Sequence, residues 1–387
     1  MNRISKIVIF MLLLLFASGV VYASESGPTS KLEEVIQVQK YFRAIHIMAM
    51  LMVGFGFLMV FVKKYGRTAV TATYIMVSIA IPGYFLLEHT GIFAHPGSQV
   101  NSLIMAEFAA AALLIAAGAV LGRLKLYQYI ILGILLVPAY TFNEWIMLSG
   151  GFGLIPAGSL VDTGGSIVIH GFGAIFGLGL IFSLTSKKEF ATEIQADATS
   201  DRFSLLGSMV LWVFWPSFCA ALVAPKDLIP TVINVVMALS GSTLAAYFSS
   251  LGLRKKVLPA DIANATLAGG VAIGSTCDVT IAPIAFVIGI AAGFISTFGF
   301  AVIQEKLQNK FKKADTCGVL YLHGLPGIFG GLVAMLVVKG INVKAQFTGV
   351  IITIIVALVT GLIAGKIVSF FGKRQVPYTD DEELDTE

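Results

Sequence analysis

Long apolar stretches separated by short polar connections make up most of this chain. Eleven of them are close to the length of about 20 residues that a helix needs to cross a bilayer. The sequence therefore predicts an all-α, polytopic membrane protein with eleven transmembrane helices. The expected spans are 41–62, 69–87, 100–121, 126–149, 163–185, 204–224, 228–252, 258–276, 281–303, 316–338 and 346–371.

The first residues have the pattern of a secretory signal. Arg3 and Lys6 precede an apolar run over 7–16, and small residues follow up to Ala23. This order predicts a cleaved signal peptide over 1–23, and the alternative is an uncleaved first helix. After cleavage the mature N-terminus would lie outside the cytoplasm.

The basic residues predict the orientation of the spans. With the N-terminus outside, most lysines and arginines fall in cytoplasmic connections, as the positive-inside rule requires. These are Lys63, Lys64, Arg67, Arg123, Lys125, Lys187, Lys188, Arg202, Arg254, Lys255, Lys256, Lys306, Lys310, Lys312, Lys313, Lys373 and Arg374. We therefore expect a multi-pass protein of the cell (inner or plasma) membrane, with one domain over 24–371 and a cytoplasmic tail over 372–387.

Composition excludes other classes of protein. Apolar residues make up 57% of the chain and charged residues only 12%, and the mean hydropathy is +0.89. A soluble globule carries roughly twice that charge. The net charge of +4 is spread over short loops, so we expect no nucleic-acid binding. The cysteines, Cys219, Cys277 and Cys317, have no metal-binding spacing and imply no disulfide framework.

One sequence pattern occurs twice, over 162–177 and 315–330. Both copies begin with Asp-Thr, contain His-Gly and end with Ile-Phe-Gly. Each copy opens an apolar span, so its histidine lies eight residues into the span. At 1.5 Å per residue this is about 12 Å below the surface. If the two helices run in opposite directions, both histidines reach the bilayer midplane.

The number of spans makes the second copy inverted relative to the first. The first copy opens the fifth span and the second opens the tenth, so they enter from opposite sides. The expected division is two inverted halves, about 41–185 and 204–338, with 346–371 as an added last helix. Many transporters have this architecture and a site between their halves. The loop 186–203 and the acidic residues 380–387 are expected to be disordered.

His170 and His323 are the strongest candidates for function. An ionisable side chain inside a span is costly and is a functional-site hypothesis by default. The alternative is two separate core histidines bonded to backbone carbonyls, but the matched positions favour a pair. Burial disfavours a charged ring, so we expect two neutral imidazoles that offer a donor and an acceptor. Such a pair suits a small polar solute that can lose its charge.

Asp162 and Asp315 begin the two copies. An aspartate before a helix accepts hydrogen bonds from unpaired backbone N–H groups and interacts with the positive end of the helix dipole. For Asp162, an additional role in attracting or deprotonating a cation stays open. For Asp315 we favour the structural cap.

Four longer motifs are spread along the chain. They are Val-Gly-Phe-Gly-Phe-Leu-Met over 53–59 with Tyr65-Gly66, Leu-Trp-Val-Phe-Trp-Pro-Ser-Phe over 211–218, Asn-Ala-Thr-Leu-Ala-Gly-Gly-Val over 264–271, and Asp-Thr-Cys-Gly over 315–318 leading to Leu-His-Gly over 322–324. These motifs resemble the Rhesus branch of the ammonium transporter (Amt/Rh) family, in particular a bacterial Rhesus-type ammonia channel. The resemblance covers roughly residues 41–371.

The resemblance implies a homotrimer in which every subunit has its own hydrophobic pore. His170 and His323 would line the pore centre, and Phe108 and Phe218 would form the constriction at its outer mouth. Asp162 would lie near the outer vestibule. From the residues alone, core packing is the default interpretation of the two phenylalanines.

The sequence departs from the family pattern near the vestibules. Met105 and Glu107 replace the usual Asn and Asp before Phe108, and Tyr321 replaces the usual Asn before Leu-His-Gly. The loop 145–161 is longer than in animal relatives. The resemblance therefore says less about the affinity for the solute and about the outer recruitment site than about the paired histidines.

We therefore expect a channel without a cofactor rather than an enzyme. Ammonium would lose its proton near the phenylalanine constriction, and ammonia would cross along the histidines. CO2 or another small neutral solute is the alternative within the same class. From another class, two histidines could bind haem in a membrane redox protein. An ammonium sensor would need a signalling domain after the last span, where the tail is too short.

Overall fold

The structure is a computed structural model, and it describes residues 30–61, 65–93, 97–185, 187–190, 196–374 and 376–385. All regular elements in these ranges are helices. The segment 1–23, expected to be a signal peptide, lies outside the described residues.

Within the described ranges, ten helices are long and apolar enough to cross a membrane. Several of these helices consist of consecutive α-helical, π-helical or 3₁₀-helical segments. The helices are α2–η1–α3–η2 (Lys31–Ala49, Met50–Phe55, Gly56–Leu58, Met59–Phe61), α4 (Gly66–His89), α5 (Gln99–Gly118), α6 (Leu126–Ser149), η4–α7 (Ser166–Gly171, Phe172–Leu184), α9 (Ala198–Cys219), η5–α10 (Pro225–Asp227, Leu228–Arg254), α13–η6–α14 (Ala282–Phe298, Gly299–Ile303, Gln304–Phe311), η7–α15 (Leu320–Gly324, Leu325–Val337) and α16 (Val343–Phe370). Because α9 begins at Ala198, the expectation of disorder was wrong for the last residues of the loop 186–203.

The expected span 258–276 is interrupted. Two short helices, α11 (Pro259–Ala265) and α12 (Ala268–Ile273), take its place and are separated by a break at Thr266. The hydroxyl of Ser242, on α10, donates a hydrogen bond to the Thr266 carbonyl at 2.6 Å. A buried break is costly when its backbone groups lack partners, and this hydroxyl supplies one. The expectation of one continuous helix was therefore wrong for this segment.

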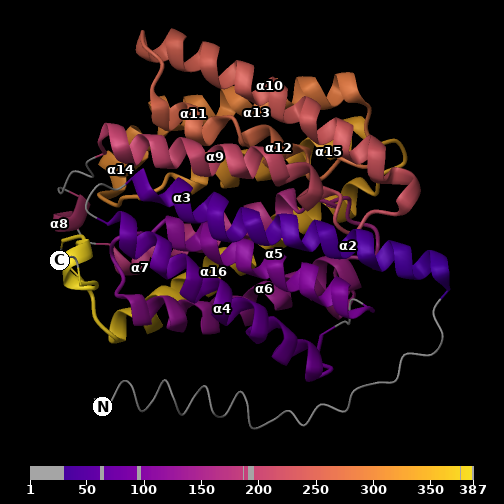
Figure 1. The fold of residues 1–387 in the computed structure, drawn as a ribbon, viewed down its shortest axis with the longest axis horizontal. Coiled ribbons are helices and arrows are strands. Elements are labelled where there is room, and N and C mark those ends of the chain that lie inside the picture. Colours follow the sequence, from indigo (N-terminus) through magenta and orange to yellow (C-terminus); the bar gives the residue numbers. More distant parts are fainter. Residues whose placement is uncertain are drawn as a thin grey trace.

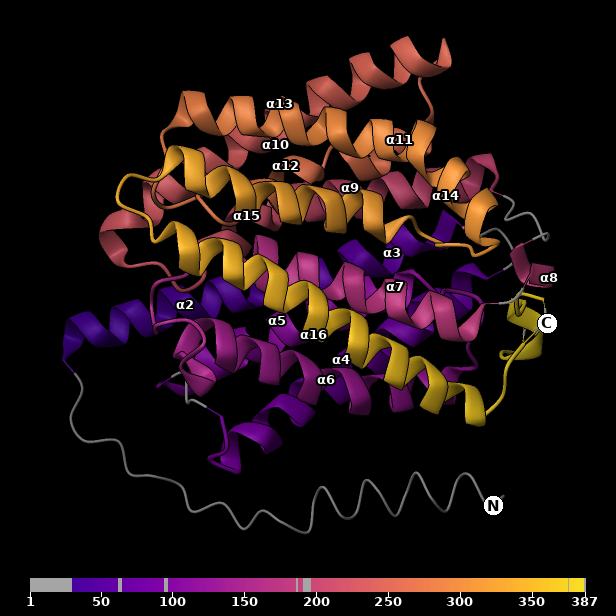
Figure 2. The ribbon, with the colours of Figure 1, turned by 180° about the vertical axis from the view of Figure 1, so that it is seen from behind.

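The last helix packs across the first half of the bundle. α2 to α7 lie together on one side and α9 to α15 on the other (Figure 1, Figure 2). α16, drawn in yellow, returns across the first group and packs along α7. A Cβ atom on Gly179 of α7 would lie only 2.7 Å from the carbonyl carbon of Gly361 of α16. Because only glycine permits this approach, the pair fixes how closely the last helix packs.

The two copies of the repeated pattern run antiparallel. Gly331, just after the second copy, packs against Ile167, early in the first: a Cβ on Gly331 would lie 2.6 Å from that side chain. Gly324, near the middle of the second copy, faces Ala174, further along the first, with a corresponding distance of 3.3 Å. Residue numbers rise along one helix as they fall along the other. We call the two ends of the bundle the Asp162 end and the Asp315 end.

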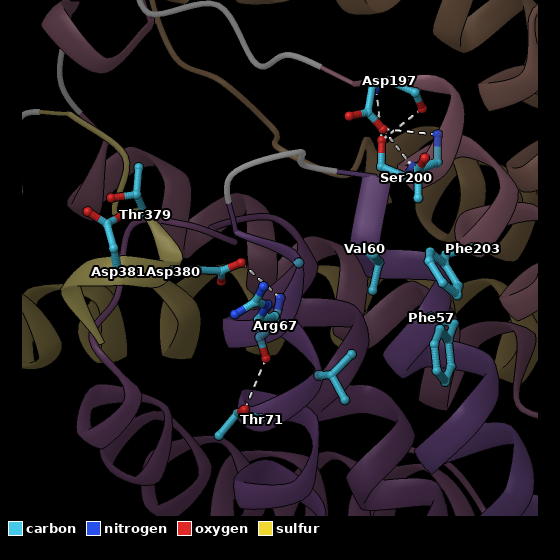
Figure 3. A pocket seen from close by; sticks show the side chains of 13 residues that line it. Phe57, Val60, Arg67, Thr71, Asp197, Ser200, Phe203, Thr379, Asp380 and Asp381 are labelled. Atoms are coloured by element: carbon cyan, nitrogen blue, oxygen red, sulfur yellow. Dashed lines mark hydrogen bonds between the residues drawn. The ribbon is translucent and has the colours of Figure 1, made fainter. Parts of the chain in front are cut away.

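The C-terminal segment is ordered against the Asp315 end, so the expectation of disorder was wrong for the described residues 380–385. The Asp380 carboxylate accepts hydrogen bonds from the N–H and hydroxyl groups of Thr68, each at 2.8 Å, and from the Arg67 N–H at 3.2 Å. Figure 3 shows Asp380 beside the first turn of α4. The Leu126 N–H, at the start of α6, donates to Glu383 at 3.2 Å. Both carboxylates satisfy backbone donors that a helix leaves unpaired at its first turn.

Further contacts hold the same segment in place. The Tyr378 N–H donates to the Gly122 carbonyl at 2.7 Å, and the Arg374 guanidinium lies 3.8 Å from the centre of the Tyr378 ring. Arg374 also pairs with Glu382, and this hydrogen bond holds the pKa of Glu382 below its usual value. The segment forms one wall of an open cavity of about 1160 Å³ (Figure 3). The other walls include Phe57, Arg67, Val70, Ser200 and Phe203.

Replacing Asp380 tests whether the tail caps α4. We expect Asp380→Ala to lower the free energy of unfolding by about 1 kcal/mol, the usual cost of a lost helix cap. Asp380→Asn keeps an acceptor oxygen in the same place and should retain most of this stability. Thermal unfolding of the purified variants in one detergent measures the difference. Equal midpoints for the wild type and both variants would contradict the capping role.

Candidate functional site

His170 and His323 meet at the crossing of the two repeat copies. The two Nδ1 atoms are 3.3 Å apart, and the rings stack with centroids 5.3 Å apart and an interplanar angle of 10°. Only 2% and 3% of the two residues' surface is exposed. His170 lies in η4 and His323 in η7, and both elements are π-helical turns. Such turns inside α-helices are frequent at functional sites.

The contact between the rings limits their protonation. Two Nδ1 atoms form a hydrogen bond only when one carries a proton and the other accepts it. Because burial disfavours a positive charge, two neutral rings of opposite tautomer satisfy this contact. Within the described residues, Nε2 of His170 has no hydrogen-bond partner. The pair can therefore offer a free ring nitrogen to a solute.

Phe108 and Phe218 lie between the histidines and the cavity at the Asp162 end. Phe108 lies on α5 and Phe218 on α9, and their ring centroids are 4.7 Å apart. Both side chains are buried. The Phe218 ring also lies 5.8 Å from the His170 ring, so the phenylalanine pair is directly beside the histidine pair. Sequence-distant residues from four helices thus form one continuous row of rings.

Two further aromatic rings flank the histidines. Trp215, on α9, stacks on His170 with centroids 5.4 Å apart, and Phe55, in η1, stacks on His323 at 6.1 Å. Trp215 is 1% exposed and Phe55 is 5% exposed. Apolar walls of this kind exclude water from the histidines and strengthen the preference for uncharged rings.

Cavities lie on either side of this row. A cavity of about 210 Å³ is at the Asp162 end, and its lining includes Phe108, Asp162 and Val168. A much smaller cavity of about 20 Å³ touches His323, Phe55 and Cys317 toward the Asp315 end. The large open cavity beside the C-terminal segment has none of the paired rings in its lining. Of these three cavities, only the two smaller ones have rings of this row, or a ring stacked on it, in their lining.

Asp162 caps the first repeat helix from inside the protein. Its carboxylate accepts hydrogen bonds from the Ile167 N–H at 3.0 and 3.1 Å and from the Val168 N–H at 2.8 Å. It also accepts the Ser275 hydroxyl at 2.6 Å. Both carboxylate oxygens are therefore occupied by protein donors. Direct contact between Asp162 and a solute would have to compete with these bonds.

Asp315 caps the second repeat helix in the same way. Its two oxygens accept the N–H groups of Val319 and Leu320, each at 3.0 Å. Burial raises the pKa of Asp162 to about 7 and that of Asp315 to about 6, while the hydrogen bonds counteract this effect. Each aspartate is followed by a turn through a glycine with positive φ, Gly165 or Gly318, which directs the helix N-terminus back at the carboxylate.

Sequence reasoning missed several residues of the site. Trp215 and Phe55 lie in apolar runs that contain many equivalent aromatic residues, so no local signal selected them. Ser275 is far from Asp162 in the sequence and only the fold brings them together. Among the residues that depart from the family pattern, Met105 lines the larger cavity, while Tyr321 packs against Phe300 with ring centroids 5.6 Å apart.

The fold defines a multi-pass membrane protein with a buried cluster of aromatic and histidine rings at its centre. The profile of the Ammonium Transporter Family matches residues 5–387. Ammonium transporter Rh type A of Bos taurus is 34% identical over 98% of this chain and 91% of its own length. Ammonium transporter Rh type B of Mus musculus is 38% identical over 76% of this chain and 65% of its own length. The chain belongs to the ammonium transporter family, in its Rhesus branch.

Solved structures show the same relation. Rh50 of Nitrosomonas europaea, described as one of the Rhesus protein family of channels, is 50% identical to this chain. It matches with a TM-score of 0.88 over 91% of this chain and 93% of its own. Mep2 of Candida albicans is only 17% identical, with a TM-score of 0.76 over 91% and 88% of the two chains, and it shows the shared fold alone.

The hydrogen bonds to Asp162 predict a structural penalty when they are lost. We expect Asp162→Ala to lower the free energy of unfolding by about 1–3 kcal/mol, because it leaves buried donors unpaired. Asp278→Asn is a suitable control, because Asp278 is close in space but half-buried and bonded to Thr163. Thermal unfolding in detergent compares the variants. A midpoint for Asp162→Ala no lower than that of the control would rule out the capping role.

Proposed function

We propose that this chain conducts ammonia across the membrane, after ammonium has lost its proton at the Asp162 end. The observation that carries the proposal is the contact between two buried imidazoles, His170 and His323, behind a pair of phenylalanine rings. Membership of the ammonium transporter family supports this choice of solute. No enzymatic activity or cofactor is part of the proposal.

The path imposes a free-energy barrier on ions. An ion that leaves water for an apolar passage loses its hydration, which a row of aromatic rings does not replace. Ammonium avoids this loss because it can leave a proton behind, whereas K⁺ cannot. Ammonia then needs only hydrogen-bond partners, and the ring nitrogens of the pair supply them.

The path is closed by side chains in this conformation, since Phe108 and Phe218 are in contact. Ammonia is small enough to pass when these rings change rotamer, a motion that buried side chains make without a change of fold. The phenylalanines therefore act as a gate in the proposal, and Asp162 helps to shape the entrance.

The finer membrane topology also belongs to this proposal. The halves 41–185 and 204–338 are inverted repeats, with 346–371 as the added helix and the interrupted α11–α12 segment as the eleventh span. The signal peptide over 1–23 is cleaved, the mature N-terminus lies outside and the tail 372–387 is cytoplasmic. The resemblance to Rhesus proteins supports a homotrimer in the inner or plasma membrane, with each subunit a separate pore.

The distance between the histidines argues against the haem alternative. The two Nδ1 atoms are only 3.3 Å apart and bond to each other, so neither is free for an iron between them. The cavity that touches His323 is only about 20 Å³, which is too small for a porphyrin. CO2 stays a competing solute that an apolar passage would also admit.

Stopped-flow measurements on proteoliposomes test the proposal. After an ammonium gradient is applied, the wild type should accelerate internal alkalinisation over protein-free vesicles. His170→Ala should slow the protein-dependent rate about tenfold, since a lost hydrogen bond costs roughly 1–1.5 kcal/mol. His46→Ala is a matched control, because His46 bonds to Ser217 and has no contact with the pair. No acceleration by the wild type would refute the proposed function.

Two further measurements distinguish ammonia from the other candidate solutes. CO2 entry, measured as internal acidification, should be insensitive to His170→Ala, because CO2 does not depend on a ring nitrogen as ammonia does. Phe218→Ala should increase leakage of ions such as K⁺, because the apolar constriction is lost. If His170→Ala slowed acidification by CO2 as much as alkalinisation by ammonia, the imidazoles would not be selective for ammonia.

A further inference from the structure

The loop 145–161, at the Asp162 end, carries aromatic rings that the proposed function does not use. Trp145, near the end of α6, lies 4.9 Å from Phe152 and 6.3 Å from Phe142, measured between ring centroids. Phe93, which follows α4, is 6.1 Å from the same tryptophan. We call these four rings the Trp145 cluster. Two connections at one end of the bundle therefore share an aromatic surface.

Phe152 exposes its ring at a cost to the backbone. Its φ is 58°, in the left-handed region that a bulky residue rarely adopts, and 70% of the residue is exposed. Leu154, two residues on, is 52% exposed. In water, glycine or asparagine at position 152 would relieve the strain, and nothing would favour two large apolar side chains. Their presence indicates an apolar neighbour outside the chain.

The composition of the loop favours the same conclusion. Residues 145–161 contain no aspartate, glutamate, lysine, arginine or histidine. Other connections at this end differ, since Lys226 and Asp227 lie between α9 and α10, and Lys339 lies between α15 and α16. A connection surrounded by water is usually polar, and an exposed apolar patch marks a contact surface.

The Trp145 cluster continues the exposed side of a membrane span. The residues of α6 that the bundle leaves partly or fully exposed recur at helical spacing and are mostly apolar: Ile134, Leu135, Pro138, Phe142 and Trp145. In a span this side contacts lipid chains. Because Phe152 packs on Trp145, the same surface extends past the end of the helix. Aromatic rings are enriched at this level, where the bilayer changes from apolar to polar.

The inner side of the loop is held firmly, so the exposed rings have a defined position. A Cβ atom on Gly151 would lie only 2.5 Å from the Trp145 ring. A Cβ on Gly349, in α16, would lie 2.6 Å from Leu160 and 3.3 Å from Ile155. The loop is therefore wedged against α6 and α16 and presents Phe152 outward.

We propose that the loop 145–161 anchors the Asp162 end in the bilayer interface, with Phe152 and Leu154 inserted among lipid chains just below the headgroups. The inference goes beyond the proposed conduction of ammonia, because it assigns a lipid contact to a segment outside the path. Leu148 and Leu160, on either side of the exposed rings, line the larger cavity. The anchor thus also fixes one wall of that cavity relative to the membrane surface.

Lipid fits this surface better than a second protein chain. A stable protein interface takes roughly 20–30 residues from each partner. The large exposed apolar side chains beside the Trp145 cluster are few, namely Ile92, Leu148, Phe152 and Leu154. Insertion into an interface needs only a few such side chains, and it needs no matching partner surface.

Spin labels measure the depth of the loop directly. Phe152→Cys is labelled in a background with Cys219→Ala, Cys277→Ala and Cys317→Ala, and the protein is placed in phosphatidylcholine vesicles. Collisions of the label with oxygen, which dissolves in the bilayer, are compared with those of a water-soluble nickel chelate. Lys339→Cys, an exposed site at the same end, is the matched control. We expect the oxygen-to-nickel ratio at 152 to be roughly tenfold higher than at 339, as for a side chain about 5–10 Å into the interface.

Leu154→Cys keeps the inference testable if the label at 152 prevents folding, and it should give the same high ratio. Equal ratios at 152, 154 and 339, with frequent nickel collisions, would place the loop in water and overturn the inference. Few collisions with either reagent at 152 and 154 would show that protein covers the loop, such as a second copy of the chain. That result would overturn the inference as well.

Discussion

The close approach of two antiparallel helices is the constraint on which the site depends. The histidines can be 3.3 Å apart only because the backbones beside them are nearly in contact. A Cβ on Gly327 would lie 2.4 Å from the Ser166 carbonyl oxygen, and one on Gly324 would lie 3.3 Å from Ala174. In a membrane, helices gain little from hydrophobic association, so packing through small residues must supply the contact. The glycines near the histidines therefore permit the close helix contact that brings the two imidazoles together.

Much of this arrangement could be predicted from the sequence, because the repeated pattern contains the residues that meet at the site. Hydropathy alone defines the membrane class, since a run of about 20 apolar residues has the length of a helix that crosses a bilayer. The duplicated Asp, His and Gly positions, with five spans between the copies, led to His170, His323, Asp162 and Asp315. Motifs also predicted the family, and the family profile and the Rhesus relatives confirm it. The roles proposed for Phe108 and Phe218 came from resemblance, because an apolar ring in an apolar helix carries no signal of its own.

The features that sequence reasoning missed depend on contacts between distant segments. Hydropathy treats 258–276 as one span, since it cannot detect that Ser242 supplies a partner for a broken backbone. The acidic tail has the composition of a disordered segment, yet helix N-termini elsewhere in the fold provide donors for Asp380.

The distribution of polar groups along the path follows from one physical requirement. An entrance that attracts a cation needs uncompensated negative charge, whereas a centre that rejects ions needs low polarity and neutral rings. These demands conflict if both groups share one compartment, because a carboxylate beside the imidazoles would stabilise imidazolium. The Phe108 and Phe218 rings separate them: carboxylates line the cavity on one side, and His170 lies behind Phe218 on the other. In the proposed conduction of ammonia, charge would be lost at that boundary, and the phenylalanine pair would divide an ionic compartment from a neutral one as well as narrow the path.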